Sequence, residues 1–329
     1  MAEYVVCVRN TEKHGSGRRF GSEPGPTKFL KVPSNRYPDP AQAIPRRQWV
    51  DEVLLKARSG VNEYTGRPTG DILVFIHGYN NSQKIVLQRH RRLQQDLEEA
   101  GYQGAVISYD WPSADIGLNY LEDRDDAKAT ALRLRNDCIN LFSSQQAAGC
   151  EINVHVIGHS TGAYVIRQAF ADADEKTSIK NRPWRASQVI LIGGDISQRS
   201  LSASDSRSKS LYRHCVRLTN YQNPYDSVLK LSNTKRIGLA PRVGRVGLPD
   251  NAHPEKAVNI NCGPYFSTLD EDSLVQGVDY YGNFKHSWHI GDKVFAADLL
   301  YTLTGDLDRR VIPTRKLING ELCLVREKS

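Results

Sequence analysis

Short apolar runs of strand length alternate with longer amphipathic stretches from residue 71 onward. Five of these runs cover residues 72–76, 105–109, 154–157, 189–192 and 215–218. Continuous apolar runs are typical of strands that are buried on both faces. Helical patterns cover residues 83–100, 123–148, 162–173 and 293–304. This alternation predicts βαβ units on a mostly parallel sheet with helices on both faces, so the expected fold class is α/β.

The first seventy residues have a different pattern. A strand-like run at residues 4–8 precedes a stretch rich in Gly, Pro and Arg at residues 10–27, and further prolines occur up to Pro45. We expect a loop at residues 10–27. Residues 1–70 are interpreted as an extension that packs on the main α/β body of residues 71–329. No internal repeat or linker calls for a further domain.

Composition limits the class of protein. The chain has 329 residues, of which 39% are hydrophobic and 25% charged, as in an ordinary globular domain with a sizeable core. No apolar run approaches the roughly 18–20 residues that span a bilayer. The N-terminus has an early acid, Glu3, and only a short apolar stretch, which argues against a secretory signal. The expected location is therefore the cytoplasm.

Neither the cysteines nor the histidines show the spacing of a metal site. The six cysteines are Cys7, Cys138, Cys150, Cys215, Cys262 and Cys323. None forms a CxxC pair, and the nine histidines form no HExxH motif. We expect reduced, mostly buried thiols and no bound metal.

The positive charge is unevenly distributed. The chain has 44 Lys and Arg against 37 Asp and Glu, a net charge of +7. Residues 1–70 carry +5, residues 71–308 carry −2 and the remaining tail carries +4. The main body is thus close to neutral, which gives little support to an acidic substrate. The basic run at residues 89–92 is interpreted as a solvated helix face, and without a nucleic-acid-binding motif no nucleic-acid partner is expected.

A G-x-S-x-G motif at residues 158–162 is the strongest chemical signal. It directly follows an apolar strand and opens a predicted helix, which is the context that a nucleophile elbow requires. A side chain at either glycine would clash in so tight a turn, and the turn aims the hydroxyl of Ser160 outward. The alternative is an ordinary helix cap beside a glycine turn. We expect Ser160 to be a nucleophile.

A serine nucleophile needs a base and an acid that orients the base. In folds with this elbow the chain order is Ser, acid, His. Asp195 and Asp226 each follow a predicted strand, and Asp226 is preferred because its strand is the later one. Asp195 remains an alternative as a capping residue or orienting acid.

Three histidines follow Asp226 in the chain. His253 lies in a polar turn, whereas His286 and His289 lie on one loop just before the last predicted helix. That placement suits a base that reaches over the nucleophile. His286 is preferred, and the other two remain alternatives.

An oxyanion hole requires backbone N–H groups that are fixed in place beforehand. Thr161 follows the nucleophile and supplies one group; the loop after an early strand, with His77 and Gly78, supplies the N–H of Tyr79. The Tyr79 hydroxyl is a further candidate for contact with substrate. Trp111 follows the second buried strand and either lines the substrate pocket or is a packed aromatic.

Several motifs occur together in a fixed order. They are VFIHGYNNS (74–82), YDWPS (109–113), GHSTG (158–162), YDSVLKLS (225–232) and HSW (286–288). This set resembles a mainly bacterial α/β-hydrolase family catalogued as a domain of unknown function, over residues 70–305 and more loosely 5–33. The resemblance implies an α/β-hydrolase fold with Ser160 as nucleophile, Asp226 as acid and His286 as base.

The chain departs from that family in places. The family often has Met after the nucleophile, where this chain has Thr161, but the backbone N–H that acts there is the same. The loops at residues 197–210 and 236–254 are peculiar to this chain, so the substrate and the oligomeric state are not indicated.

Together these residues predict a serine hydrolase that forms a covalent acyl-enzyme. The expected substrate is a small-molecule carboxylic ester, with thioesters, amides and transfer to another acceptor as alternatives. No metal or organic cofactor is expected. A non-catalytic binding protein of the same fold is the competing hypothesis.

Overall fold

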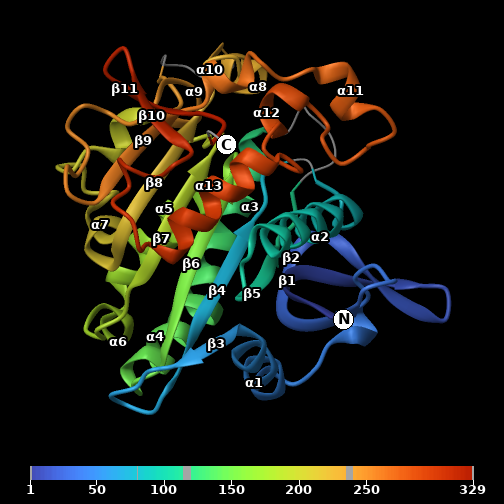
Figure 1. Ribbon diagram of the computed structural model, residues 1–329. Coiled ribbons are helices and arrows are strands. Elements are labelled where there is room, and N and C mark those ends of the chain that lie inside the picture. The colour runs from blue at the N-terminus through green and yellow to red at the C-terminus, as the bar shows by residue number, and fades with distance from the viewer. Residues whose placement is uncertain (1, 80, 114–119, 235–239, 328–329) are drawn as a thin grey trace.

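The computed structural model describes residues 2–79, 81–113, 120–234 and 240–327, and these form one large sheet with helices on both faces (Figure 1). Its strands are β1 (Ala2–His14), β2 (Gly17–Pro33), β3 (Arg58–Val61), β4 (Pro68–Ile76), β5 (Ala105–Asp110), β6 (Glu151–His159), β7 (Ala186–Ile192), β8 (Cys215–Gln222), β9 (Ala257–Asn261), β10 (Arg315–Ile318) and β11 (Glu321–Leu324). Their order is β10-β11-β9-β8-β7-β6-β4-β5-β1-β2, and β3 pairs with β4.

The centre of the sheet is parallel. All neighbours from β9 to β1 run parallel, whereas the pairs β1–β2, β10–β11 and β3–β4 are antiparallel. The carboxyl ends of β4, β5, β6, β7 and β8 therefore meet at one edge, where ligands bind in open sheets of this kind.

Thirteen α-helices are present in the described residues. They are α1 (Arg46–Ala57), α2 (Gln83–Ala100), α3 (Tyr120–Arg133), α4 (Asn140–Ala147), α5 (Thr161–Glu175), α6 (Thr177–Lys180), α7 (Lys209–His214), α8 (Ser227–Thr234), α9 (Val243–Val246), α10 (Gly263–Phe266), α11 (Glu271–Val275), α12 (Phe284–Ser287) and α13 (Lys293–Thr304). Short helical turns η1 (Pro40–Gln42) and η3 (Gln198–Leu201) and the π-helix η2 (Leu134–Ile139) complete the set.

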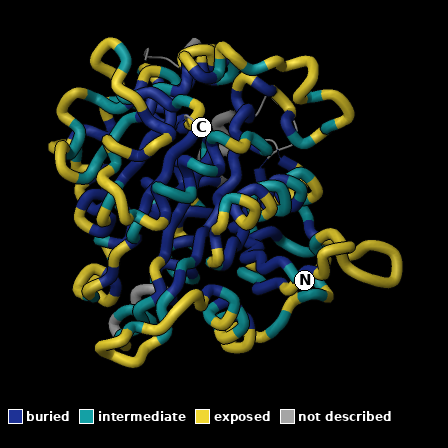
Figure 2. Tube along the Cα trace, in the orientation of Figure 1, coloured by how far each residue is buried: buried dark blue, intermediate teal, exposed yellow. Residues whose placement is uncertain are grey.

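Alternate residues of the central strands face two separate apolar layers. Ile72, Val74 and Ile76 of β4 pack with residues of α1, α3, α5 and α7. Leu73 and Phe75 point to the other face, where α2 and α13 cover the sheet. Figure 2 shows this buried centre and an exposed rim of loops. Burial on both faces explains why the strand sequences are continuously apolar.

The predicted α/β class with helices on both faces of a mostly parallel sheet is confirmed. The five strands predicted for the main body are present as β4 to β8, and the strand-like run at residues 4–8 lies in β1. The predicted helices correspond to α2, the α3–η2–α4 segment, α5 and α13. The six cysteines are free, and five of them are buried, as expected. None of the helices in the described ranges is long and apolar enough to cross a bilayer.

The expected loop at residues 10–27 was wrong. β1 and β2 form a long antiparallel hairpin through this segment, and β1 also pairs in parallel with β5 over residues 4–7. The residues of the outer part of the hairpin are mostly polar and exposed (Figure 2). This part therefore lacks the apolar run that is typical of a central strand. The hairpin extends the central sheet.

The basic run at residues 89–92 is not a solvated face throughout. His90 is fully buried, and Arg89 is buried and donates to the backbone carbonyls of Tyr280 and Tyr281. Arg91 pairs with Glu3 and Arg92 with the buried Asp96. Arg89 and Arg91 therefore bind α2 to its neighbours, whereas the Arg92–Asp96 pair lies within the helix, and this leaves less of the run for an acidic partner.

Candidate active site

Ser160 lies at the turn between β6 and α5 in a backbone conformation that residues with a Cβ rarely adopt. Its φ is 56° and its ψ is −123°. Such a conformation costs about 1–3 kcal/mol and persists only where the surroundings enforce it. Here the N–H of Ser160 donates to the carbonyl of Ile192 at 3.1 Å, and its own carbonyl accepts from the N–H of Asp195 at 3.0 Å. The elbow is thus tied to the end of β7.

Two glycines allow the backbone to approach the elbow closely. A Cβ on Gly162 would lie 2.2 Å from the carbonyl oxygen of Ile76, and one on Gly78 would lie 2.6 Å from the Cβ of Ser160. The end of β4, the loop that follows it and the first turn of α5 therefore pack without space for a methyl group. This places the backbone of Gly78 directly beside Ser160.

Asp226 and His286 form a short hydrogen bond. The Nδ1 of His286 lies 2.6 Å from Oδ2 of Asp226, and both side chains are buried. The other carboxylate oxygen of Asp226 accepts the backbone N–H of Leu229 at 2.9 Å, in the first turn of α8. The acid is therefore oriented by a helix N-terminus on one side and directs the imidazole on the other.

The segment that carries His286 is held by its backbone. The amide of Asn223 donates to the carbonyl of Lys285 at 3.0 Å, and the side chain of Asn283 accepts the N–H of His286 at 3.2 Å. The Nε2 of His159 lies 3.1 Å from the carbonyl of His286. Burial lowers the pKa of His159 well below its usual value, so its ring is neutral and donates through this nitrogen.

The serine and the His–Asp pair lie at the same edge of the sheet. A Cβ on Gly193, which follows Ile192, would lie 3.3 Å from Cε1 of His286 and 3.6 Å from Oδ2 of Asp226. The ring centroids of His159, the neighbour of Ser160, and His286 are 4.6 Å apart. Ser160, Asp226 and His286 thus all lie at the carboxyl ends of the central strands, with 7%, 1% and 8% of each residue exposed.

The alternative acid and bases have other surroundings. Asp195 forms an ion pair with the buried Arg242 at 3.1 Å. His253 precedes β9 and lies near Tyr212, at the amino ends of the strands rather than the carboxyl ends. His289 is buried, its Nδ1 has no hydrogen-bond partner among the residues that the structure describes, and its ring lies 4.9 Å from that of His159. Burial lowers the pKa of His289 well below its usual value.

The residues predicted for the oxyanion hole are the chain neighbours of Ser160 and of Gly78, which packs against Ser160. Thr161 is the first residue of α5, so its N–H has no partner within the helix. Tyr79 follows Gly78 and is half-buried. Trp111 is fully buried, stacks on His77 and donates through Nε1 to the carbonyl of His77 at 2.9 Å. This arrangement corresponds to the packed aromatic rather than to a pocket wall.

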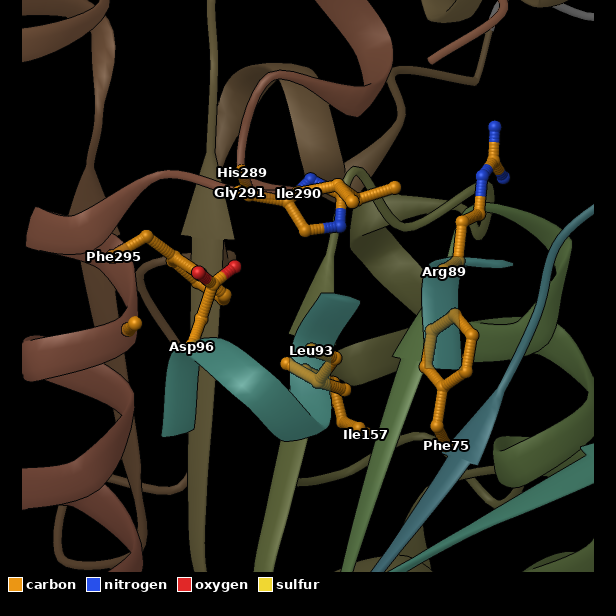
Figure 3. Close-up of a pocket in the computed structure, with 10 residues that line it drawn as sticks. Phe75, Arg89, Leu93, Asp96, Ile157, His289, Ile290, Gly291 and Phe295 are labelled. Carbon is orange, nitrogen blue, oxygen red and sulfur yellow. The ribbon is translucent and has the colours of Figure 1, made fainter. Parts of the chain in front are cut away.

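A largely apolar pocket lies next to this site, between α2, α13 and the sheet (Figure 3). Its lining includes Phe75, Leu93, Ile157, His289 and Phe295. Neither the serine nor the His–Asp pair lines it, so we do not assign it to the substrate. Among the residues that the structure describes, no group of three or more His, Cys, Asp or Glu side chains could hold a metal ion.

Sequence reasoning missed the residues that hold the site in position. Asn223 lies only three residues before Asp226, and a turn so close to a candidate acid was the available signal. Gly193 follows a predicted strand directly, where a close backbone approach could have been expected. His159 stands inside the G-x-S-x-G motif, but nothing in the sequence indicates its bond to a carbonyl 127 residues away.

A model of a known protein family matches about two thirds of the chain. The family model described as "Alpha/beta hydrolase of unknown function (DUF900)" matches residues 56–271. Ser160 and Asp226 lie within this range and His286 lies beyond it. None of the curated proteins matches the chain.

Several solved structures are similar at low identity. A cutinase-like protein from Cryptococcus sp. is 16% identical, with 74% of this chain and 96% of that chain covered and a TM-score of 0.32. Acyl-protein thioesterase 2 from Zea mays is 18% identical, with 67% of this chain and 94% of that chain covered and a TM-score of 0.34. A Trichoderma reesei cutinase is 12% identical, with 79% of this chain and 85% of that chain covered and a TM-score of 0.32. TM-scores this low indicate nothing about the substrate of this chain.

Proposed function

Because the chain belongs to the alpha/beta hydrolase family of unknown function, we propose that it is a serine hydrolase that cleaves a small-molecule carboxylic ester through a covalent acyl-enzyme. The observation that carries this proposal is the His286–Asp226 hydrogen bond beside the strained elbow of Ser160. A strained serine next to an oriented imidazole is the arrangement that nucleophilic acyl transfer needs.

In the acylation step, the Oγ of Ser160 attacks the ester carbonyl while Nε2 of His286 takes the hydroxyl proton. Asp226 accepts from Nδ1, which fixes the tautomer and stabilises the imidazolium that forms. The N–H groups of Tyr79 and Thr161 donate to the developing oxyanion. When the tetrahedral intermediate collapses, His286 returns the proton to the alkoxide, and the alcohol leaves.

Deacylation repeats these roles with water. His286 takes a proton from water as the oxygen attacks the acyl carbon, and the same two N–H groups bind the second oxyanion. Collapse releases the carboxylic acid, and the proton passes from His286 to Oγ of Ser160. One ester and one water are consumed, one alcohol and one carboxylic acid are released, and Ser160 and His286 return to their starting protonation states.

A panel of p-nitrophenyl esters with graded acyl length tests this proposal. We expect turnover of at least one ester and its loss, by at least about a thousandfold, in Ser160→Ala and His286→Ala. The matched control is His253→Gln. It removes a histidine at the amino ends of the strands, far from the proposed site, and should leave turnover within twofold of wild type. Turnover that survives in Ser160→Ala, or no turnover of any ester, would contradict the proposal.

A further inference from the structure

The carbonyl of Gly78, in the loop beside Ser160, is fixed by two side chains. The Nδ1 of His77 lies 2.8 Å from this oxygen, and Nδ2 of Asn81 donates to it at 2.9 Å. In a trans peptide the C=O of one residue and the N–H of the next point in opposite directions. Holding the Gly78 carbonyl therefore also sets the direction of the Tyr79 N–H, which is one of the two groups proposed for the oxyanion hole.

The ring of His77 is in turn fixed in one protonation state. It is fully buried, and burial lowers its pKa, so the ring is neutral at neutral pH. Its Nε2 accepts the backbone N–H of Trp111 at 3.2 Å, and the indole of Trp111 stacks on it with 5.4 Å between centroids. The proton therefore resides on Nδ1, which donates to Gly78.

Asp110 and Arg9 form a buried ion pair next to His77. Oδ1 of Asp110, at the end of β5, lies 3.4 Å from Nε2 of His77, and only 1% of Asp110 is exposed. Nε of Arg9 contacts the two carboxylate oxygens at 3.0 and 3.1 Å. Although burial acts in the opposite direction, the positive charge of Arg9 holds the pKa of Asp110 well below its usual range.

Arg9 also contacts the loop directly. Its Nη2 donates to the carbonyl of Asn81 at 3.2 Å, and Asn81 is one of the two residues that hold Gly78. Arg9 belongs to β1, which lies outside the residues that the family model matches. One side chain of the N-terminal hairpin thus contacts Asn81 directly and is linked to His77 through Asp110.

We propose that Arg9 is a positioning residue of the oxyanion hole: through Asp110, His77 and Asn81 it fixes the Gly78 carbonyl and thereby the direction of the Tyr79 N–H. This inference rests on the proposed function. Without Arg9, the buried carboxylate of Asp110 lacks its cation and favours a proton on Nε2 of His77. That proton would displace the Trp111 N–H and release the ring from its present orientation.

The test is the change of Arg9 to Gln, with kcat expressed per active site titrated by a fluorophosphonate. An oxyanion hole acts mainly in the transition state, and losing one donor costs about 10²–10³ in kcat. Since Arg9 acts through other residues, we expect kcat per site to fall by about tenfold to a hundredfold with KM within twofold of wild type. Arg9→Lys keeps the charge but loses the forked contact, and should recover part of this loss.

Lys13→Gln is the matched control, because it removes an exposed positive charge from the same strand. Its kcat per site should equal that of wild type, and a thermal melt of each variant reports loss of folding separately. A purely structural role for Arg9 would lower the melting temperature and the fraction of titratable sites without changing kcat per site. Wild-type kcat per site in Arg9→Gln, or an equal fall in Lys13→Gln, would overturn the inference.

If Arg9→Gln does not fold, Arg9→Lys decides alone. A kcat per site at least about threefold below wild type with KM unchanged supports the positioning role, and a wild-type value overturns it. If the wild-type protein is labelled at Ser160 but the Arg9 variants keep the wild-type kcat per site, this inference is refuted and the proposed function is not. A wild-type protein that is not labelled refutes the proposed function and this inference with it.

Discussion

Asp226 serves two neighbours with its two carboxylate oxygens. One caps the first turn of α8 and the other accepts from His286, so a single side chain couples a helix to the imidazole. Chain order leaves Asp195 and Asp226 as acids and three histidines as bases, and the position of each along the chain favours Asp226 and His286. The sequence marks the turns at Asn223 and Gly193 but cannot place either residue beside this pair, since close contacts depend on the register of neighbouring strands.

Replacing Asp226 by Asn should lower kcat by about 10⁴, the size of effect seen when the orienting acid of a serine triad becomes an amide. The amide can donate to Nδ1 of His286 and so stabilise the wrong tautomer. Steady-state ester kinetics per titrated site measures this. Asp195→Asn is the comparison: if it lowers kcat per site more than Asp226→Asn does, the alternative acid is the correct one.

Backbone strain at Ser160 predicts a stability difference between two inactive variants. Ser160→Ala keeps the Cβ and the strained conformation, whereas Ser160→Gly removes both. We expect the glycine variant to be more stable by about 1 kcal/mol and both to lack turnover. Chemical denaturation of the two proteins measures this, and equal free energies of unfolding would show that the elbow carries no such strain.

At the element scale, α2 carries buried polar groups that its amphipathic pattern did not indicate. His90 faces β5, where its Nδ1 lies 2.7 Å from the hydroxyl of Ser108. The central strands were predictable because both faces are apolar. In the β1–β2 hairpin only the buried run at residues 4–8 was predictable. The rest of the hairpin and the edge strands β10 and β11 were not, because half-exposed strands need sheet partners that a local pattern does not reveal.

His90 predicts how stability depends on pH. Burial, with the nearby charge of Lys56, lowers its pKa to about 3, whereas an unfolded histidine titrates near about 6.5. Between these values the unfolded chain binds a proton that the folded chain does not. Stability contributed by neutral His90 is therefore lost as pH falls below about 6.5, at up to about 1.4 kcal/mol per pH unit.

The variant His90→Gln should flatten this acid dependence by about one proton. Free energies of unfolding measured from pH 7.5 to pH 4.5 give the slope for each protein. Buried His77, His159 and His289 contribute in the same direction, so the variant keeps part of the dependence. An unchanged slope would contradict the neutral, buried state of His90.

At the scale of the whole molecule, ion pairs within the protein neutralise part of the basic charge of residues 1–70. Arg9 pairs with Asp110 of β5, and Lys31 pairs with Glu52, which also lies in residues 1–70. Arg9–Asp110 takes one positive charge from residues 1–70 and Glu3–Arg91 takes one negative charge, so these pairs leave the excess of +5 unchanged. Regional charge counts cannot show this, because they do not tell which charges fold against each other.

Removing residues 1–33 should abolish cooperative folding. The deletion uncovers the edge of β5 and takes away Val5, Cys7, Leu30 and Val32, which pack with Leu87 of α2. Burying a side chain of this size contributes about 1.5–3 kcal/mol, and typical domains are stable by only about 5–15 kcal/mol. Calorimetry of the shortened chain is the measurement, and a cooperative transition within a few degrees of wild type would contradict it.

The residue with which a fluorophosphonate reacts tests the assignment of Ser160 most directly. We expect one adduct per chain in the wild-type protein, located on Ser160 by peptide mass spectrometry, and no adduct in Ser160→Ala. His286→Ala should label far more slowly, because the hydroxyl then lacks its base. Labelling that persists in Ser160→Ala, or a wild-type protein that is never labelled, would contradict the assignment of Ser160 as the nucleophile.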